Sequence, residues 1–195
     1  MRRPFSPVRT GVWVGIAAIT MSFAAYTSAM VVREGAAADW QHIRLPQLIY
    51  FNTLILLLSS VTLQLGTSRV RWSWLETASD RGAVRGIRPQ GLGWLDLTLA
   101  LGLLFLAGQL LVWRNLAGQG LYLATSPTYA FFYVFTVLHA LHLLGGIVAL
   151  GYMLRRIRRS LADDPPDQAL GAAALYWHFM DVLWLYLLMI LVLRL

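Results

Sequence analysis

The chain has 195 residues, of which 58% are hydrophobic and only 13% charged, and it contains no cysteine. This composition is too apolar for an ordinary soluble domain and predicts a protein that crosses a membrane several times. Without cysteine, the chain can form no disulfide, no thiolate nucleophile and no cysteine-bound metal or iron–sulfur centre.

Five long runs with few or no charges follow one another along the chain. They predict five transmembrane helices at residues 11–32, 47–66, 91–113, 128–154 and 169–193. The longest connection, residues 67–90, is too short for a folded domain. The predicted fold is therefore all-α, a polytopic membrane protein in which residues 1–195 form a single membrane domain.

The first run has some features of a secretion signal, because Arg2-Arg3 precedes it and Ala36-Ala37-Ala38 resembles a cleavage site. The apolar core of a signal peptide is about 7–15 residues long, whereas residues 11–32 are uncharged throughout. We therefore expect the first helix to be retained as a membrane span.

The net charge of +7 reflects membrane topology rather than nucleic acid as a partner. The N-terminal tail, the second loop and the fourth loop carry twelve arginines: Arg2, Arg3, Arg9, Arg69, Arg71, Arg81, Arg85, Arg88, Arg155, Arg156, Arg158 and Arg159. The opposite side carries four: Arg33, Arg44, Arg114 and Arg194. Because cytoplasmic segments hold the excess of positive residues, we predict a cytoplasmic N-terminus and a C-terminus outside. The group at 155–159 is interpreted as a topology anchor, with a lipid headgroup or a partner protein as the alternative contact.

The polar residues inside the last two predicted helices are His139, His142, His178 and Asp181. Trp177, Asp181 and Trp184 are spaced i, i+4 and i+7, so they share one helix face. An ionisable side chain inside a membrane is costly unless it is paired, so Asp181 should face protein or water. Counted from the cytoplasmic helix ends, His142 lies at about 20 Å and Asp181 at about 16 Å. His142 and His178 are therefore its candidate partners.

This polar group has a functional and a structural interpretation. The functional one is a metal, haem or proton site; the structural one, which we favour, is hydrogen bonding between helices. Three intramembrane histidines cannot supply two bis-histidine haems, although a mono-haem cytochrome stays open, and no HExxH motif supports zinc. A proton-coupled transporter also stays open. However, Asp96 and Asp181 are the only acids in the predicted helices, so a proton relay would need a partner subunit.

Two further features predict close contact between helices. The second helix carries the small or polar residues Asn52, Ser59, Ser60 and Thr62. Such residues mark close packing in lipid, either against a partner subunit or against other helices of this chain. Gly145-Gly146, one turn from His142, should allow a neighbouring helix to approach.

Several segments resemble subunit III of the haem-copper oxidases. Residues 131–132 and 137–146, which contain HALHLLGG, are similar to the family pattern FF…GxHGLHVxxG. Residues 176–184, YWHFMDVLW, resemble its terminal YWHFVDVVW motif. Residues 52–60, NTLILLLSS, are similar to its N-T-x-x-L-x-x-S-S segment, and Gly11-Val12-Trp13 matches the start of its G-x-W helix. The motifs occur in the family's order, and together the resemblance covers nearly the whole chain.

The resemblance is to the short, five-helix bacterial form, whose orientation agrees with the arginine count. It implies a subunit of cytochrome c oxidase in aerobic electron transport, in the bacterial cytoplasmic (inner) membrane. It also implies no redox cofactor in this chain, because haem and copper belong to partner subunits. On this resemblance, the family motif forms a structural polar cluster without catalytic or metal-binding residues: His139, His142, Trp177, His178, Asp181 and Trp184.

The family also implies partners. Subunit III packs directly on subunit I in a complex that includes subunit II, supports proton uptake there and protects the oxidase from inactivation during turnover. Bound phospholipid is common, and a supercomplex with a quinol:cytochrome c oxidoreductase is a further candidate assembly. The nearest alternative is the accessory subunit of a quinol oxidase or of a nitric oxide reductase.

The chain departs from the family pattern at two places. Many relatives carry an acid after a serine in the first of the five helices, where this chain has Ile19 after Ala18. Many also carry a glutamate late in the third helix, where residues 109–114 read QLLVWR. We therefore do not carry over a proton or lipid role that depends on those acids. The HALHLLGG and YLATSPTYAFF segments resemble caa3-type relatives most closely.

Overall fold

The computed structural model describes residues 7–36, 40, 45–79, 91–159 and 167–194. Within these ranges it contains five α-helices: α1 (Pro7–Ala36), α2 (Leu48–Ser79), α3 (Leu92–Gly118), α4 (Pro127–Arg159) and α5 (Asp167–Arg194). Each is long and apolar enough to cross a membrane. The prediction of an all-α, multi-pass membrane protein with five spanning helices is confirmed.

Most observed helices extend well beyond the predicted ranges. The second helix was predicted to end near residue 66 but continues to Ser79, and the fourth continues through the arginine group to Arg159. Hydropathy detects only the part of a helix that fits the apolar layer, whereas the backbone hydrogen bonds continue past it. For α2, the part apolar enough to span a membrane is Leu48–Ser73.

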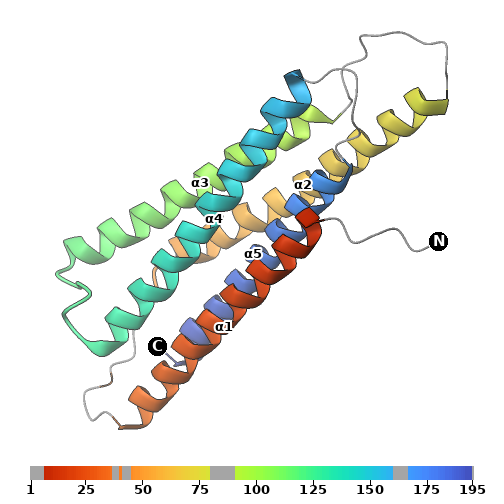
Figure 1. Ribbon diagram of the computed structural model, residues 1–195. Helices are drawn as coiled ribbons and strands as arrows, with labels where there is room; N and C mark the ends of the chain where they lie inside the picture. The colour runs from red at the N-terminus through yellow and green to blue at the C-terminus, as the bar shows by residue number, and fades with distance from the viewer. Residues whose placement is uncertain (1–6, 37–39, 41–44, 80–90, 160–166, 195) are drawn as a thin grey trace.

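Four helices form a closed ring, and the first lies outside it. Contacts join α2 to α3, α3 to α4, α4 to α5 and α5 back to α2, while α1 packs against α5 and α4. Consecutive helices run in opposite directions, so the beginning of α1 and the end of α5 lie toward opposite ends of the bundle (Figure 1). Helix α5 therefore touches three neighbours, and its side chains determine much of the core.

The α2–α3 pair is held by close backbone contact. A Cβ added to Gly66 would lie 2.8 Å from Cδ2 of Leu95, so the glycine lets α3 approach. Gly91, which precedes α3, has a φ of 110°, a backbone conformation that favours glycine, and lies against the carbonyl of Gly66. These contacts fix the register between the two helices and thereby the polar residues that they carry.

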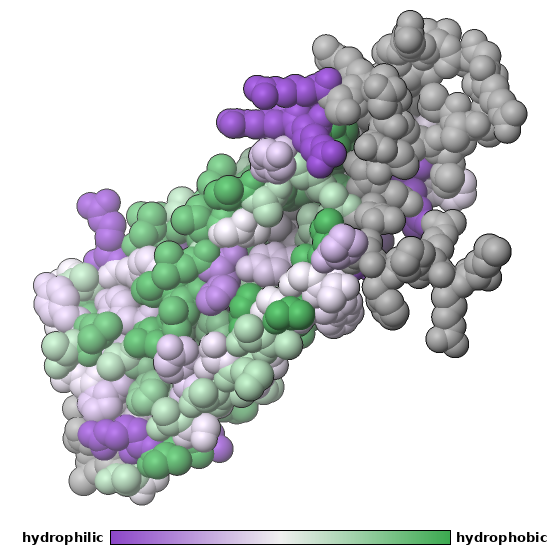
Figure 2. Space-filling model, viewed as in Figure 1, coloured by the Kyte–Doolittle hydropathy of each residue, from purple (hydrophilic) through white to green (hydrophobic). Residues whose placement is uncertain are grey.

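The surface follows the membrane pattern. On the face seen in Figure 2, apolar side chains cover the middle of the bundle and hydrophilic ones gather mainly toward its ends. Asp96, which the sequence placed among the intramembrane acids, lies near the start of α3 and pairs with Arg158 near the end of α4, with both side chains about half exposed. At the other end Arg194 pairs with Glu34. Both ion pairs lie near helix termini.

Candidate functional site

The predicted stripe on α5 faces the interior. Trp177, Asp181 and Trp184 are 1%, 4% and 0% exposed, which confirms that they share a buried face. The ring of Trp177 lies over Gly102 of α3, where a Cβ would come within 2.8 Å of the indole. The ring of Trp184 packs edge-on against Phe105, one turn further along α3. The stripe thus contacts α3 across the centre of the ring of helices.

Both indoles also reach α2. Nε1 of Trp177 donates to Oγ of Ser59 over 3.1 Å, and Nε1 of Trp184 donates to Oγ1 of Thr53 over 2.9 Å. An indole N–H can only donate, and in an apolar core it needs an acceptor. Each hydroxyl in turn donates to a carbonyl of its own helix. Two hydrogen-bonded pairs therefore connect α5 to α2.

Asp181 lies beside a chain of polar groups that leads outward. Its Oδ2 is 3.9 Å from Nδ1 of His178, close enough for an ion pair but too long for a hydrogen bond. The same Nδ1 is 2.6 Å from Oγ of Ser60, and Nε2 of His178 is 3.3 Å from Oε1 of Gln64. Among the described residues, no group donates a hydrogen bond to either carboxyl oxygen of Asp181.

The two histidines of α4 have other neighbours. His139 is fully buried between the rings of Phe105 and Trp184, and neither ring nitrogen has a hydrogen-bond partner among the described residues. Nδ1 of His142 lies 2.7 Å from the carbonyl of Leu138 on its own helix.

His142 faces the outer helix rather than Asp181. Its ring packs edge-on against Phe23 of α1, and its carbonyl accepts a hydrogen bond from the hydroxyl of Tyr176. Nδ1 of His142 instead bonds the carbonyl of Leu138 on its own helix, so this nitrogen is not directed at Asp181. Of the two candidates, His178 lies beside the carboxylate.

The predicted six-residue cluster is thus divided among three places. Trp177, His178 and Trp184 contact α2, with Asp181 beside His178; His139 packs against the ring of Trp184 in the centre; His142 lies toward α1. In the part of the chain that the structure describes, no three histidine, aspartate or glutamate side chains gather as a metal-binding group.

The polar residues of α2 mostly face inward. Nδ2 of Asn52 donates to the carbonyl of Phe105, and Oγ1 of Thr62 lies 2.9 Å from Oγ1 of Thr98, both on α3. Asn52, Ser59 and Thr62 are buried, so the hypothesis that they face a partner subunit is wrong for these three. These residues instead contact other helices of this chain, which is the second of the two alternatives that the sequence left open.

Several buried polar residues on α3 and α4 were not predicted from the sequence. Gln109 is 1% exposed, and Nε1 of Trp113 donates to Oγ1 of Thr136 across α3 and α4. These residues could have been identified as uncharged polar residues within an apolar run. Of the two predicted glycines, only Gly146 is closely packed: a Cβ there would lie 3.0 Å from the ring of Tyr176, whereas one on Gly145 would meet nothing within 4 Å.

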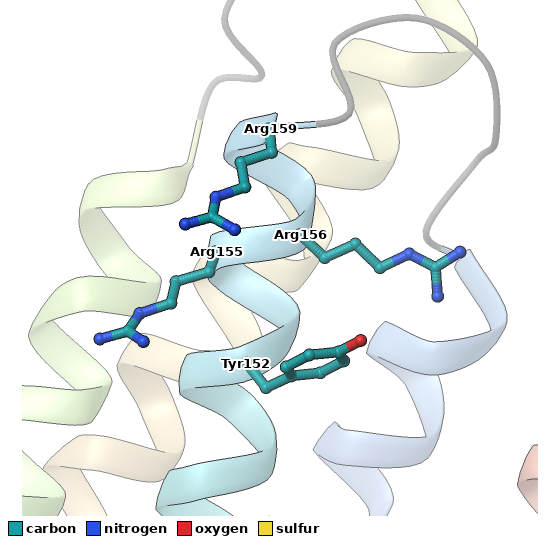
Figure 3. Close-up of a pocket in the computed structure, with 4 residues that line it drawn as sticks. All are labelled: Tyr152, Arg155, Arg156 and Arg159. Carbon is teal, nitrogen blue, oxygen red and sulfur yellow. The ribbon is translucent and has the colours of Figure 1, made fainter.

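The arginine group borders an open pocket of about 560 Å³ at the end of α4. Arg155 and Arg159 extend toward α3, whereas Arg156 and the hydroxyl of Tyr152 point toward α5 (Figure 3). A second, mostly apolar pocket of about 420 Å³ begins at Tyr152 and Arg156 and continues between α1, α4 and α5 over small residues such as Gly146 and Ala172. A cationic pocket above an apolar groove can hold an anionic amphiphile.

The sequence was compared with those of known proteins and protein families. The sequence model described as cytochrome c oxidase subunit III matches residues 14–193. The probable cytochrome c oxidase subunit 3 of Mycobacterium tuberculosis (strain CDC 1551 / Oshkosh) is 34% identical over 137 residues, which cover 69% of this chain and 60% of that protein.

Two other relatives have a similar identity to this chain. The cytochrome c oxidase subunit 3 of Corynebacterium diphtheriae is 33% identical over 153 residues, or 78% of this chain and 66% of the relative. That of Thermostichus vulcanus is 35% identical over 137 residues, or 70% and 60%. The chain thus spans about 60% of the length of most of these relatives.

Proposed function

Because the chain belongs to the cytochrome c oxidase subunit III family, we propose that it is the third subunit of a bacterial haem-copper oxidase in aerobic respiration. Cytochrome c is the proposed electron donor, and the cytoplasmic membrane is the proposed location. The sequences of residues 122–132 and 139–146 resemble those of caa3-type relatives, and this resemblance favours a caa3-type enzyme. Haem and copper belong to partner subunits in this proposal.

One observation supports an accessory role above all. Three polar groups of the family motifs donate hydrogen bonds between helices: Trp177 to Ser59, Trp184 to Thr53 and Tyr176 to the carbonyl of His142. They lie apart instead of converging on one reactive centre. Side chains arranged in this way position helices, which is what a subunit that supports a catalytic neighbour requires.

We propose that this subunit packs directly on subunit I, in a complex with subunit II, and supports proton uptake and turnover stability there. A proton path through this chain alone would need a series of titratable groups across the membrane. Asp96 pairs with Arg158 near one helix end, whereas Asp181 is buried in the centre of α5. An effect on proton uptake would therefore act on subunit I.

Purification of a tagged chain in mild detergent tests this proposal. We expect subunits I and II to co-purify, with the haem absorption and cytochrome c oxidation residing in the complex. Removing the subunit should leave initial turnover measurable but shorten its duration. A haem spectrum from the isolated chain would contradict the proposal, as would co-purification of a quinol oxidase or a nitric oxide reductase in place of a cytochrome c oxidase.

We also propose that a phospholipid binds at the arginine pocket, with its phosphate at Arg156 and an acyl chain in the adjacent groove. The support is the cationic rim over small, apolar residues. Arg156→Gln should lower the amount of anionic lipid that co-purifies, measured by mass spectrometry. Arg114→Gln, at the other end of the bundle, is the control and should leave that amount unchanged. Equal lipid in both variants would contradict the site.

A further inference from the structure

The outward face of α5 carries a polar centre within an apolar stripe. Seven residues spaced three or four apart form this stripe: Gly171, Leu175, His178, Val182, Leu185, Met189 and Val192. It extends over about 31 Å at 1.5 Å per residue, which is close to the thickness of the hydrocarbon core. His178 lies about 14 Å from the start of the span at Ala169, near the middle of the membrane.

This face lies between two neighbouring helices. On one side His178 contacts Ser60 and Gln64 of α2, and on the other Tyr186 donates a hydrogen bond to Thr27 of α1. The side chain of His178 is 39% exposed, and Gln64 is exposed beside it. An imidazole and a carboxamide are therefore open at the depth where lipid offers no hydrogen bond.

The hydrogen bonds leave part of the Gln64 carboxamide unpaired. Nδ1 of His178 accepts from the hydroxyl of Ser60 if Nε2 carries the proton, and Nε2 then donates to Oε1 of Gln64. The carboxamide nitrogen of Gln64 has no partner among the described residues. Exposed Thr20 and Ser22 on α1 differ, because their hydroxyls donate to carbonyls of their own helix. Unsatisfied polar groups in hydrocarbon cost several kcal/mol, so they normally face protein.

We propose that the outward face of α5, together with Ser60 and Gln64, is the surface on which a transmembrane helix of subunit I docks. This inference rests on the proposed function and assigns its contact surface. The docked helix presents a hydrogen-bonding group to the carboxamide of Gln64 near mid-membrane, and aliphatic side chains along the rest of the stripe. Asp181, behind His178, then lies one side chain away from the interface.

Site-specific crosslinking in the intact complex tests the surface. The chain has no cysteine, so Val182→Cys and Val148→Cys each provide a single attachment site within this chain for a thiol-reactive benzophenone. The two valines are a matched pair, 65% and 64% exposed on α5 and α4. We expect Val182→Cys to crosslink to subunit I and Val148→Cys not to.

The outcomes separate this inference from the proposed function. If subunit I is present in the purified complex, and Val148→Cys forms adducts with it while Val182→Cys forms none, the proposed surface is wrong but the proposed function stands. Adducts of Val182→Cys with lipid only, or with a second copy of this chain, would also overturn it. A complex without any oxidase subunit would contradict the function and this inference together.

A second variant tests the polar contact itself. Gln64→Leu should lower the fraction of subunit retained on the complex through a detergent wash by about threefold, the effect of an average interhelical hydrogen bond in a membrane. Ser22→Ala, which removes an exposed hydroxyl that bonds only to its own helix, is the control and should not change retention. Equal retention of the two variants would contradict a polar contact at Gln64.

Discussion

Buried polar side chains in this bundle differ in whether the chain satisfies them. The indoles of Trp177 and Trp184 have acceptors on α2, whereas the carboxylate of Asp181 and the imidazole of His139 have no hydrogen-bond partner among the described residues. Leaving a buried polar group unpaired costs about 1–3 kcal/mol. Asp181 can be changed to asparagine, which removes its charge but keeps its shape, or to leucine, which also removes its polarity.

Substitution of Asp181 should distinguish a structural from a proton-conducting role. Asp181→Asn keeps the size and polarity of the side chain, so we expect nearly normal assembly. Asp181→Leu removes the carboxylate that lies within ion-pair distance of Nδ1 of His178 and leaves this partly buried ring and Ser60 beside an apolar side chain, so we expect loss of the subunit from the complex. Neither variant should change the haem spectrum of the oxidase. Full assembly of Asp181→Asn with abolished turnover would instead assign Asp181 to a proton path.

The contact between Asn52 and α3 depends on a glycine. A Cβ on Gly108 would lie 2.3 Å from Oδ1 of Asn52, so Gly108→Ala should displace the side chain that bonds the carbonyl of Phe105. Overpacking of this kind costs about 1–3 kcal/mol, measured as the free energy of unfolding in detergent. Gly145→Ala is the control: its Cβ meets nothing, and it should be neutral or stabilising by up to about 1 kcal/mol. Equal stability of both variants would contradict the close packing.

At the scale of helices, the sequence predicted which segments cross the membrane but not which neighbour each one meets. Uncharged runs longer than about 20 residues specify spans because the bilayer imposes their length. The inward face of α5 was also predictable from the spacing of Trp177, Asp181 and Trp184. The partners of these residues were not, because periodicity identifies a buried face without naming the helix opposite. The same limit explains why Asn52, Ser59 and Thr62 were compatible with either an internal or an external contact.

The α2–α5 connection can be measured by a double-mutant cycle. Trp177→Phe and Ser59→Ala remove the two partners of one hydrogen bond, and the cycle cancels the packing that the indole loses over Gly102. We expect a coupling energy of about 0.6 kcal/mol, and at most about 1.7 kcal/mol, in the free energy of unfolding. Trp177→Phe with Thr53→Ala is the matched non-partner pair and should be additive within about 0.5 kcal/mol. Similar coupling in both cycles would mean that the hydrogen bond does not hold these helices.

At the scale of the whole molecule, the antiparallel bundle separates the described arginines into two groups. One end carries Arg9, Arg69, Arg71 and the four arginines of α4, and the other carries Arg33, Arg114 and Arg194. The predicted sites Arg2, Arg3, Arg44, Arg81, Arg85 and Arg88 lie outside the described residues. The fold thus keeps each described arginine on the side that the sequence analysis assigned to it. Which side faces the cytoplasm is set by the positive charge itself, since the helices alone would fit a membrane in either direction.

Reporter fusions test that orientation. Because the described residues contain five spans, an odd number, a C-terminus beyond α5 lies on the opposite side of the membrane from the start of α1. The larger arginine group should remain in the cytoplasm, so alkaline phosphatase fused after Leu195 should be active, since that enzyme matures only outside the cytoplasm. The same enzyme fused between α2 and α3 is the control and should be inactive. Activity between α2 and α3 combined with inactivity after Leu195 would invert the orientation and would place Asp96, Arg158 and the arginine pocket on the outer surface.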